Sequence, residues 1–342
     1  MKIQTYFIRR LAYSLLVLFG LSILIFFIAR VLPGNPLRMA LGARVPQWVL
    51  ENLKKELNLD KPIYMQYIIW LKNALHGNLG ISLLSRRPVL DDIKLFLPAT
   101  LEIMFLAVII ETVGGLLLGA LSALHIGKWP DNLLRLVAYL GVVTPSFIWA
   151  VIFMLIFGFM WPILPVLGRL SPHLTPPQIV TGFMTIDSLI SGNINLFWDA
   201  LKHLIMPATA LAFGGMAQAT RVTRSSMLET LNLDYIWAEI ASGIPTRLII
   251  SKYAFKPSLI SPVSIIGLDV AAMIGNAFLV ELVFNYPGIS RYGVNAILSK
   301  DLNAVVAVIM VIGVTFVFVN MFIDLIIATI DPRVRIQMGG KA

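Results

Sequence analysis

The chain of 342 residues is 58% hydrophobic and 13% charged, with a net charge of +9 and no cysteine. Soluble domains carry about 25% charged residues, so this composition, with a mean hydropathy of +0.84, excludes an ordinary soluble protein and predicts that lipid covers part of the surface. The lack of cysteine excludes disulfides and thiolate metal sites, and the basic residues lie at the ends of apolar segments, so we expect no nucleic acid partner.

Apolar segments long enough to cross a bilayer predict six transmembrane helices. About 20 residues, rising 1.5 Å each, cover the hydrocarbon core of roughly 30 Å. The predicted spans are residues 10–31, 99–124, 133–160, 201–221, 259–283 and 303–329. The first is too long for a signal-peptide core and no cleavage pattern follows it, so we expect it to remain as an anchor. The third contains Thr144-Pro145, which a buried helix can tolerate.

A long segment, residues 32–98, separates the first two spans. Within it, apolar residues recur at helical spacing from Pro46 to Asn73, and Pro62 divides them into two short amphipathic helices. We expect a small extracytoplasmic helical insertion that packs on the transmembrane helices, caps a pore or contacts a partner.

The distribution of lysine and arginine predicts the orientation. Counted over the shorter loops, these residues are more frequent on the side of the N-terminus, which the positive-inside rule places in the cytoplasm. An even number of spans then puts the C-terminal tail, residues 331–342, on the same side.

The fourth and fifth spans are joined by residues 222–258, named here the polar loop. Residues 234–242, DYIWAEIAS, predict a short helix with a face of small residues that allows close approach of a partner. Gly243 suits the end of that helix, and Pro245 suits the first turn of a second one. Either the loop is a docking site, or its first helix rests on the bilayer with aromatic side chains at the headgroups.

Two carboxylates, Glu111 and Asp269, fall well inside predicted spans. An intramembrane carboxylate is costly and is therefore a candidate functional group, for example in the proton relay of a secondary transporter. The alternative is that each is protonated, or hydrogen-bonded within the bundle or across the interface with a partner subunit. This alternative is favoured because secondary carriers commonly have internal repeats and more spans, and no repeat is apparent here.

Motifs for enzymatic chemistry are absent from the sequence. There is no His-Glu-x-x-His pair, no Gly-x-Ser-x-Gly elbow, and no Gly-x-x-x-x-Gly-Lys-Ser/Thr loop that would bind ATP. We therefore expect a non-catalytic membrane protein with no cofactor of its own.

A series of short motifs in this order along the chain resembles the permease subunits of binding-protein-dependent ABC importers, specifically the dipeptide, oligopeptide and nickel group. The motifs are LNLDKP (57–62), GNLGISLLSRRPV (77–89), LPATLE (97–102), TPSF (144–147), LPVLGR (164–169), HLIMPA (203–208), TRSSMLE (223–229), DYI (234–236), VELVFNYPGIS (280–290) and IDPRVR (330–335).

This resemblance implies an all-α integral membrane protein of the six-helix ABC importer permease type, in the plasma (inner) membrane of a prokaryote. It implies pairing with a second, similar permease, an extracytoplasmic solute-binding protein that delivers substrate, and two cytoplasmic ATPase subunits that bind the ATP and Mg. The chain would divide into residues 1–31, the insertion 32–98, a permease domain 99–330 that includes the polar loop, and the tail 331–342.

The resemblance also implies that the ATPases dock on the polar loop. The residues expected to couple them to transport are Asp234, Tyr235, Ala238, Glu239, Ala241, Gly243 and Arg247. The family favours Glu-Ala-Ala, three variable residues and Gly, and its peptide branch has a more basic stretch before that Gly. Here Glu239 replaces an expected small residue, so it either pairs with a basic residue of the ATPase or faces water.

The substrate is not specified by these residues. Members of the resembled group move dipeptides, longer peptides, nickel complexes or oligosaccharides, and selectivity rests largely with the binding protein. We take peptides as the first choice, with oligosaccharides and nickel complexes as alternatives.

Overall fold

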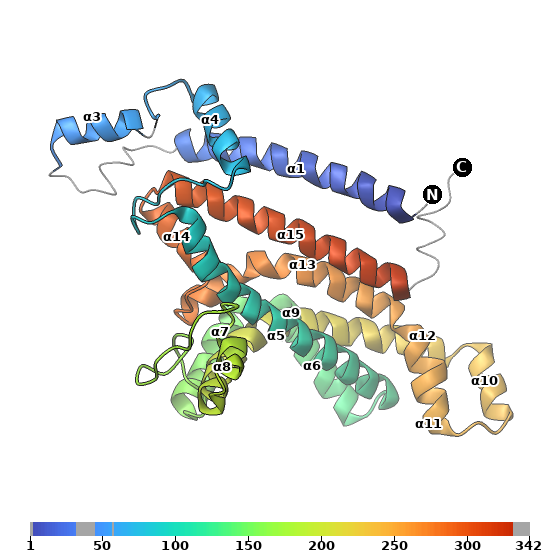
Figure 1. Cartoon of the computed structure of the whole chain (residues 1–342). Helices are drawn as coiled ribbons and strands as arrows, with labels where there is room; N and C mark the ends of the chain where they lie inside the picture. Colours follow the sequence, from blue (N-terminus) through green and yellow to red (C-terminus); the bar gives the residue numbers. More distant parts are fainter. Residues whose placement is uncertain (1–2, 32–44, 57, 331–342) are drawn as a thin grey trace. The chain divides into compact units, whose positions relative to one another are not determined.

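The computed structural model describes residues 3–31, 45–56 and 58–330 (Figure 1). The predicted tail, residues 331–342, and part of the predicted insertion, residues 32–44, lie outside the described residues. The described residues are predominantly helical and form no strand beyond an isolated bridge between Ile81 and Pro88. This confirms the predicted all-α fold.

The helices form two compact units. Unit 1 holds the described residues of Met1–Thr100, Ile179–Phe183 and Pro287–Phe318, and unit 2 holds those of Leu101–Gln178, Met184–Tyr286 and Val319–Ala342. Two long helices, α5 (Val89–Leu124) and α15 (Leu302–Ile330), contribute to both units.

Among its described residues, unit 1 also contains four helices of its own: α1 (Ile3–Val31), α3 (Gln47–Glu56), α4 (Ile63–Leu75) and α14 (Ile289–Leu298). The two helices predicted on either side of Pro62 are confirmed as α3 and α4. Pro62 immediately precedes α4, where its fixed φ favours a helix start and its missing N–H costs no hydrogen bond.

An aromatic cluster holds α4 against α1. The Phe26 ring lies 5.3 Å from that of Tyr67 and 5.5 Å from that of Trp70, measured between centroids. The hydroxyls of Ser22 and Tyr67 are 2.8 Å apart, within hydrogen-bonding distance, and Arg30 Nε donates to Gln66 Oε1 at 2.7 Å. The insertion therefore has a fixed attachment to the first span.

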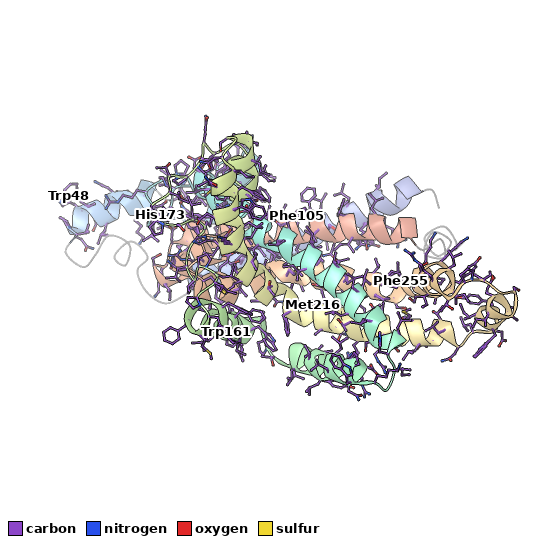
Figure 2. The ribbon with its side chains drawn as sticks, turned by 90° about the horizontal axis from the view of Figure 1, so that it is seen from below. Trp48, Phe105, Trp161, His173, Met216 and Phe255 are labelled. Atoms are coloured by element: carbon purple, nitrogen blue, oxygen red, sulfur yellow. The ribbon has the colours of Figure 1, made fainter. Side chains whose placement is uncertain are left out.

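Unit 2 is built around α9 (Ile194–Leu231), whose neighbours include four other helices. These are α6 (Trp129–Val143), α7 (Ser146–Phe153), α8 (Met184–Ile190) and α13 (Ile260–Val283). The π-helical segment η1 (Met154–Met160) extends α7. Other helices expose large apolar side chains: Phe105 of α5, 67% exposed, points away from its helix (Figure 2). Such surfaces suit contact with lipid.

Glycines allow α9 to approach its neighbours closely. A Cβ atom added to Gly115 or Gly119 of α5 would lie 2.5 Å from the Cβ of Ala219 or Thr223. A Cβ added to Gly141 of α6 would likewise lie 2.5 Å from the Cβ of Ala217. Small residues at helix contacts are typical of membrane bundles, where van der Waals packing must replace the hydrophobic effect.

Within the part of the chain that the structure describes, four helices are long and apolar enough to cross a membrane. They are Ile8–Arg30, Val89–Leu124, Ile260–Val283 and Leu302–Leu325, which agree with the first, second, fifth and sixth predicted spans. The bent pair described next would raise the number to five, so the predicted total of six is not confirmed.

The prediction of an unbroken third span, residues 133–160, is wrong. The chain bends by 116° between α6 and the segment Ser146–Met160. Thr144 is extended, with φ −92° and ψ 124°, because the ring of Pro145 disfavours the α conformation in the residue before it. The proline begins a new helix instead of being accommodated in a continuous one.

The predicted fourth span, residues 201–221, lies within α9 but does not meet the same test of length and apolarity. The burial of α9 among other helices explains its lower apolarity. Other helices cover much of α9, so its surface need not be apolar throughout, and it carries Lys202, Gln218 and Arg221.

Candidate functional site

The polar loop extends from the ends of α9 and α13 (Figure 1). It contains α10 (Asp234–Ala241), α11 (Thr246–Leu248), the π-helical segment η2 (Ile249–Phe255) and α12 (Lys256–Ser258). A first helix, a break and a second helical segment were predicted and are confirmed. The second segment is not a regular α-helix, because η2 forms a wider turn within it.

Gly243 ends α10 in a defined turn. The N–H of Gly243 donates to the carbonyl of Ile240 at 3.0 Å, and the N–H of Ile244 donates to that of Glu239 at 3.2 Å. This pair of bonds is a Schellman motif, which needs a left-handed residue after the helix, and Gly243 supplies it with φ +75°. The turn directs the chain back alongside α10.

A hydrogen bond between side chain and backbone joins α10 to η2. Pro257 has no N–H, so the carbonyl of Tyr253, four residues earlier, lacks the donor that an α-helix would provide. The Tyr235 hydroxyl donates to this carbonyl at 2.8 Å. Tyr235 was predicted as a coupling residue, and the structure also gives it a role inside the loop.

The polar loop has a small core and an apolar outer face. Ile236 is buried with Ile249 and Ala254, whereas Trp237 is 61% and Ile240 47% exposed. The structure brings together the seven residues predicted for coupling. Six of these are exposed, namely Asp234, Tyr235, Ala238, Ala241, Gly243 and Arg247, and Glu239 is half-buried.

An ion pair anchors the base of the polar loop to the bundle. Arg224, near the end of α9, donates from Nε and Nη2 to the two carboxylate oxygens of Asp131 at 2.6 and 2.9 Å. The buried Asp131 also accepts from the Ser122 hydroxyl at 2.6 Å and the Gly127 N–H at 3.0 Å. The turn between α5 and α6 is therefore tied to the helix that enters the loop.

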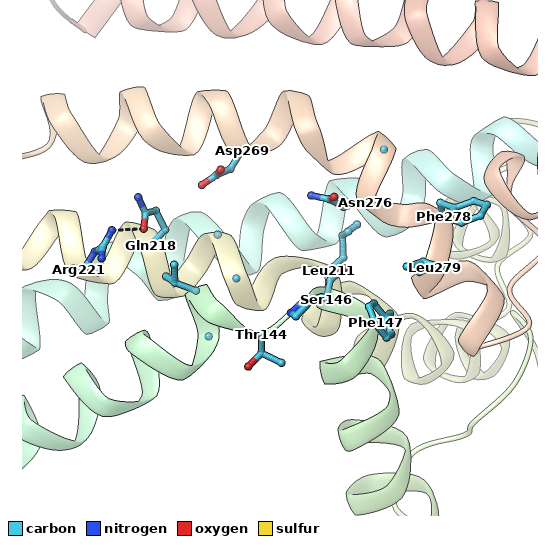
Figure 3. A pocket seen from close by; sticks show the side chains of 16 residues that line it. Thr144, Ser146, Phe147, Leu211, Gln218, Arg221, Asp269, Asn276, Phe278 and Leu279 are labelled. Atoms are coloured by element: carbon cyan, nitrogen blue, oxygen red, sulfur yellow. Dashed lines mark hydrogen bonds between the residues drawn. The ribbon is translucent and has the colours of Figure 1, made fainter.

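A cavity of about 600 Å³ opens beside α9. Its lining comes from three segments: residues 141–147 at the bend, 211–221 of α9, and 269–279 of α13. Figure 3 shows Asp269 and Asn276 projecting from α13 toward α9, which presents Gln218 and Arg221. Polar groups from two helices thus face one space.

The two charged groups of the cavity do not satisfy each other. Arg221 Nη2 donates to Gln218 Oε1 at 2.8 Å, and no ion pair joins Arg221 to Asp269 among the described residues. The buried oxygen Oδ2 of Asp269 has no hydrogen-bond partner there. Asp269 was predicted as a candidate, but Gln218, Arg221 and Asn276 were not. The spacing of Asn276, two helical turns after Asp269, places both residues on one face of the helix and was the sequence signal that could have identified Asn276.

Glu111, the other predicted carboxylate, is more deeply buried than Asp269. It is fully buried on α5, and neither carboxylate oxygen has a hydrogen-bond partner among the described residues. A Cβ added to Gly215 of α9 would lie 2.5 Å from its carboxylate carbon. Glu111 thus packs against a glycine that lines the cavity but is itself absent from the lining.

In the described ranges, no cluster of three or more His, Asp or Glu could hold a metal ion.

Most of the sequence matches models of known families. Residues 115–336 match the model described as the binding-protein-dependent transport system inner membrane component. Residues 3–104 match the N-terminal model for membrane components of the same kind of transport system.

Similar proteins cover nearly the full length of the chain. The probable D,D-dipeptide transport system permease protein of Escherichia coli (strain K12) is 38% identical, covering 95% of this chain and 96% of that protein. The dipeptide transport system permease protein of Alkalihalophilus pseudofirmus is 36% identical, with 96% and 99% covered. The di/tripeptide transport system permease protein of Pseudomonas aeruginosa is 35% identical, with 96% and 98% covered.

Proposed function

The chain belongs to the family of inner membrane components of binding-protein-dependent transport systems, and we propose that it is a permease subunit through which di- and oligopeptides enter the cytoplasm. The family assignment confirms the resemblance inferred from the motifs. The substrate proposal rests on the relatives described above, whose names specify dipeptides, D,D-dipeptides, and di- and tripeptides. These names favour peptides over oligosaccharides and nickel complexes.

The polar loop is our proposed docking site for two cytoplasmic ATPase subunits. The observation that carries this proposal is the exposed apolar face of α10 beside the small residues Ala238, Ala241 and Gly243. Small residues permit close approach, and exposed apolar side chains become stabilising when a partner buries them. Movement of the ATPases would reach the bundle through α9 and the ion pair between Arg224 and Asp131.

The other subunits of the transporter and the topology of this chain belong to the same proposal. A second, similar permease completes the pathway, and an extracytoplasmic binding protein delivers the peptide. ATP and Mg are bound by the ATPases, and this chain is non-catalytic. Both termini are cytoplasmic, and the four-part division of the chain, with the insertion 32–98 outside, is retained as a proposal.

We do not propose proton-coupled transport, the alternative considered from the intramembrane carboxylates. Family members work with binding proteins, and the fully buried Glu111 is not part of the cavity lining. Its carboxylate packs directly against Gly215 of α9.

Co-purification is the direct test of the proposed assembly. The tagged chain would be isolated from its native membrane in mild detergent and its partners identified by mass spectrometry. We expect a second permease and two ATPase copies. Recovery of the chain alone would contradict the proposal.

Uptake assays then test the substrate and the driving force. In proteoliposomes containing the complex and its binding protein, we expect ATP to drive accumulation of radiolabelled dialanine. A pH gradient alone should drive none. Uptake driven by the pH gradient without ATP would instead support the proton-coupled carrier. ATP-driven uptake of an oligosaccharide but not of dialanine would show that the substrate is an oligosaccharide and not a peptide.

A further inference from the structure

We propose that the cavity beside α9 holds the charged termini of the passing peptide, with Asp269 receiving the α-ammonium group and Arg221 the carboxylate. This inference rests on the proposed function and assigns residues of this chain to its substrate. The first observation is the pair of opposite charges that line one space without forming an ion pair with each other.

The unsatisfied carboxylate of Asp269 is the second observation. Placing a carboxylate in a membrane-spanning helix is costly unless a cation or hydrogen-bond donors compensate it. The described residues supply no donor to the buried Oδ2 of Asp269, so no hydrogen bond within the described bundle compensates this oxygen. A ligand that brings an ammonium group into the cavity would provide the missing partner.

Arg221 can offer the complementary contact. Its guanidinium carries five N–H donors, and Nη2 uses one of them in the hydrogen bond to Gln218 at 2.8 Å. The side chain is exposed at the cavity, so the remaining donors can reach a carboxylate. Gln218 lies beside Arg221 in Figure 3, and its Oε1 accepts the hydrogen bond that fixes one edge of the guanidinium.

The rest of the lining suits a substrate whose side chains vary. Four of the lining residues are glycines, at positions 141, 214, 215 and 275, which leave space rather than select a shape. The volume of about 600 Å³ falls within the range of roughly 300–1,000 Å³ that is usual for small-molecule sites. Every unmodified linear dipeptide has an α-ammonium group at its N-terminus and a carboxylate at its C-terminus, so contacts to these two groups are independent of its sequence.

A cysteine reporter in the cavity can test the proposal without the binding protein. The chain contains no cysteine, so Asn276→Cys introduces the only thiol of this subunit. The variant complex, with cysteines removed from the other subunits, would be placed in inside-out vesicles without ATP. Its modification by a trimethylammonium thiosulfonate reagent would be timed with and without dialanine.

We expect millimolar dialanine to slow modification of the reporter thiol, and N-acetyl-dialanine amide, which lacks both charges, to have no effect. Adding Asp269→Asn should raise the dialanine concentration needed for protection about tenfold, as expected for loss of a charge-assisted hydrogen bond. Arg221→Gln should act in the same direction, and Asp269→Glu should retain protection. Leu268→Ala, a change at an exposed neighbour outside the lining, serves as the control and should not alter protection.

Equal protection by the charged and the blocked peptide would overturn the proposal, as would unchanged protection when Asp269→Asn is added. A reporter thiol that does not react at all would also overturn it, because the cavity would then be closed to water. Failure of the proposed function appears separately, as a wild-type complex that takes up no dialanine with ATP.

Discussion

The polar loop and the Asp269 cavity belong to the same unit of the protein but are built in different ways. The loop is one continuous stretch, closed by the turn at Gly243 and by the bond from Tyr235 to Tyr253. The cavity is assembled from segments that extend from residue 141 to residue 279. Local structure determines the shape of the first, and helix packing determines that of the second. Substitutions should therefore affect one without the other.

The largest effect is expected from Gly119→Leu, which should disrupt the close packing of α5 on α9. A Cβ at this position would lie 2.5 Å from the Cβ of Thr223 and 2.7 Å from the carbonyl oxygen of Thr220. The backbone contact cannot be relieved by a rotamer change, so we expect a cost of about 3 kcal/mol or more. Size-exclusion chromatography and thermal unfolding in detergent should detect the loss of folded protein.

Gly20→Leu is the matched control, because a Cβ at Gly20 has nothing within 4 Å. It makes the same substitution in another membrane-spanning helix. If both variants remain equally folded, the close packing of α5 on α9 does not determine the stability of unit 2.

Gly243→Val should leave the bundle folded but reduce ATP-driven uptake by more than tenfold. There is room for the side chain, since a Cβ has nothing within 4 Å, but φ is +75°. This conformation costs a non-glycine residue roughly 1–2 kcal/mol, so the Schellman turn would distort and α10 would be misplaced. Uptake and ATP hydrolysis should be measured together, because uncoupling lowers the first more than the second.

Two further variants separate the backbone of the loop from its surface. Gly243→Asn should retain most uptake, because asparagine tolerates the left-handed conformation. Ala238→Arg leaves the turn intact but places a large charge on the exposed face, and it should reduce co-purification of the ATPases. Normal uptake in both Gly243→Val and Ala238→Arg would exclude the polar loop as the coupling element.

An intermediate effect is expected at the connection between the two regions. Arg224→Gln removes the cation that pairs with the buried Asp131, which should cost about 2 kcal/mol of stability and reduce uptake a few-fold. Adding Asp131→Asn removes the uncompensated charge, so the double variant should be more stable than Arg224→Gln alone. Thermal unfolding of the four combinations gives the coupling energy, and strict additivity would contradict an energetically important ion pair.

The same contrast explains which features could be predicted from the sequence. The helices beside Pro62 and the break at Gly243 were predicted correctly, because proline and glycine act on their immediate neighbours. Pro145 acts locally too, but its effect was underestimated, since whether a proline bends or breaks a buried helix depends on what surrounds it. Asp131 and Arg224 are 93 positions apart, and no pattern in the sequence links them.

Arg221 shows the limit most clearly. Its place at the end of an apolar segment was interpreted as a mark of membrane topology, whereas the structure places it in the cavity lining. A single helix tells which residues share a face, but not whether that face meets lipid, another helix or an open space. The cavity is formed by the packing of α6, α7, α9 and α13, and the sequence of one helix does not predict it.

Tyr235→Phe should produce the smallest effect and is the most specific test of local closure. It removes only the hydroxyl that donates to the Tyr253 carbonyl at 2.8 Å, at an expected cost of about 1 kcal/mol. Since this bond closes the loop but does not support the cavity, hydrogen exchange should accelerate several-fold in residues 249–258 while the cysteine reporter at position 276 reacts as before. Tyr253→Phe is the matched control, because it also removes a tyrosine hydroxyl but keeps the carbonyl acceptor. Equal acceleration in both variants would mean that the hydrogen bond does not hold α10 against η2, and that the small core around Ile236 closes the loop by itself.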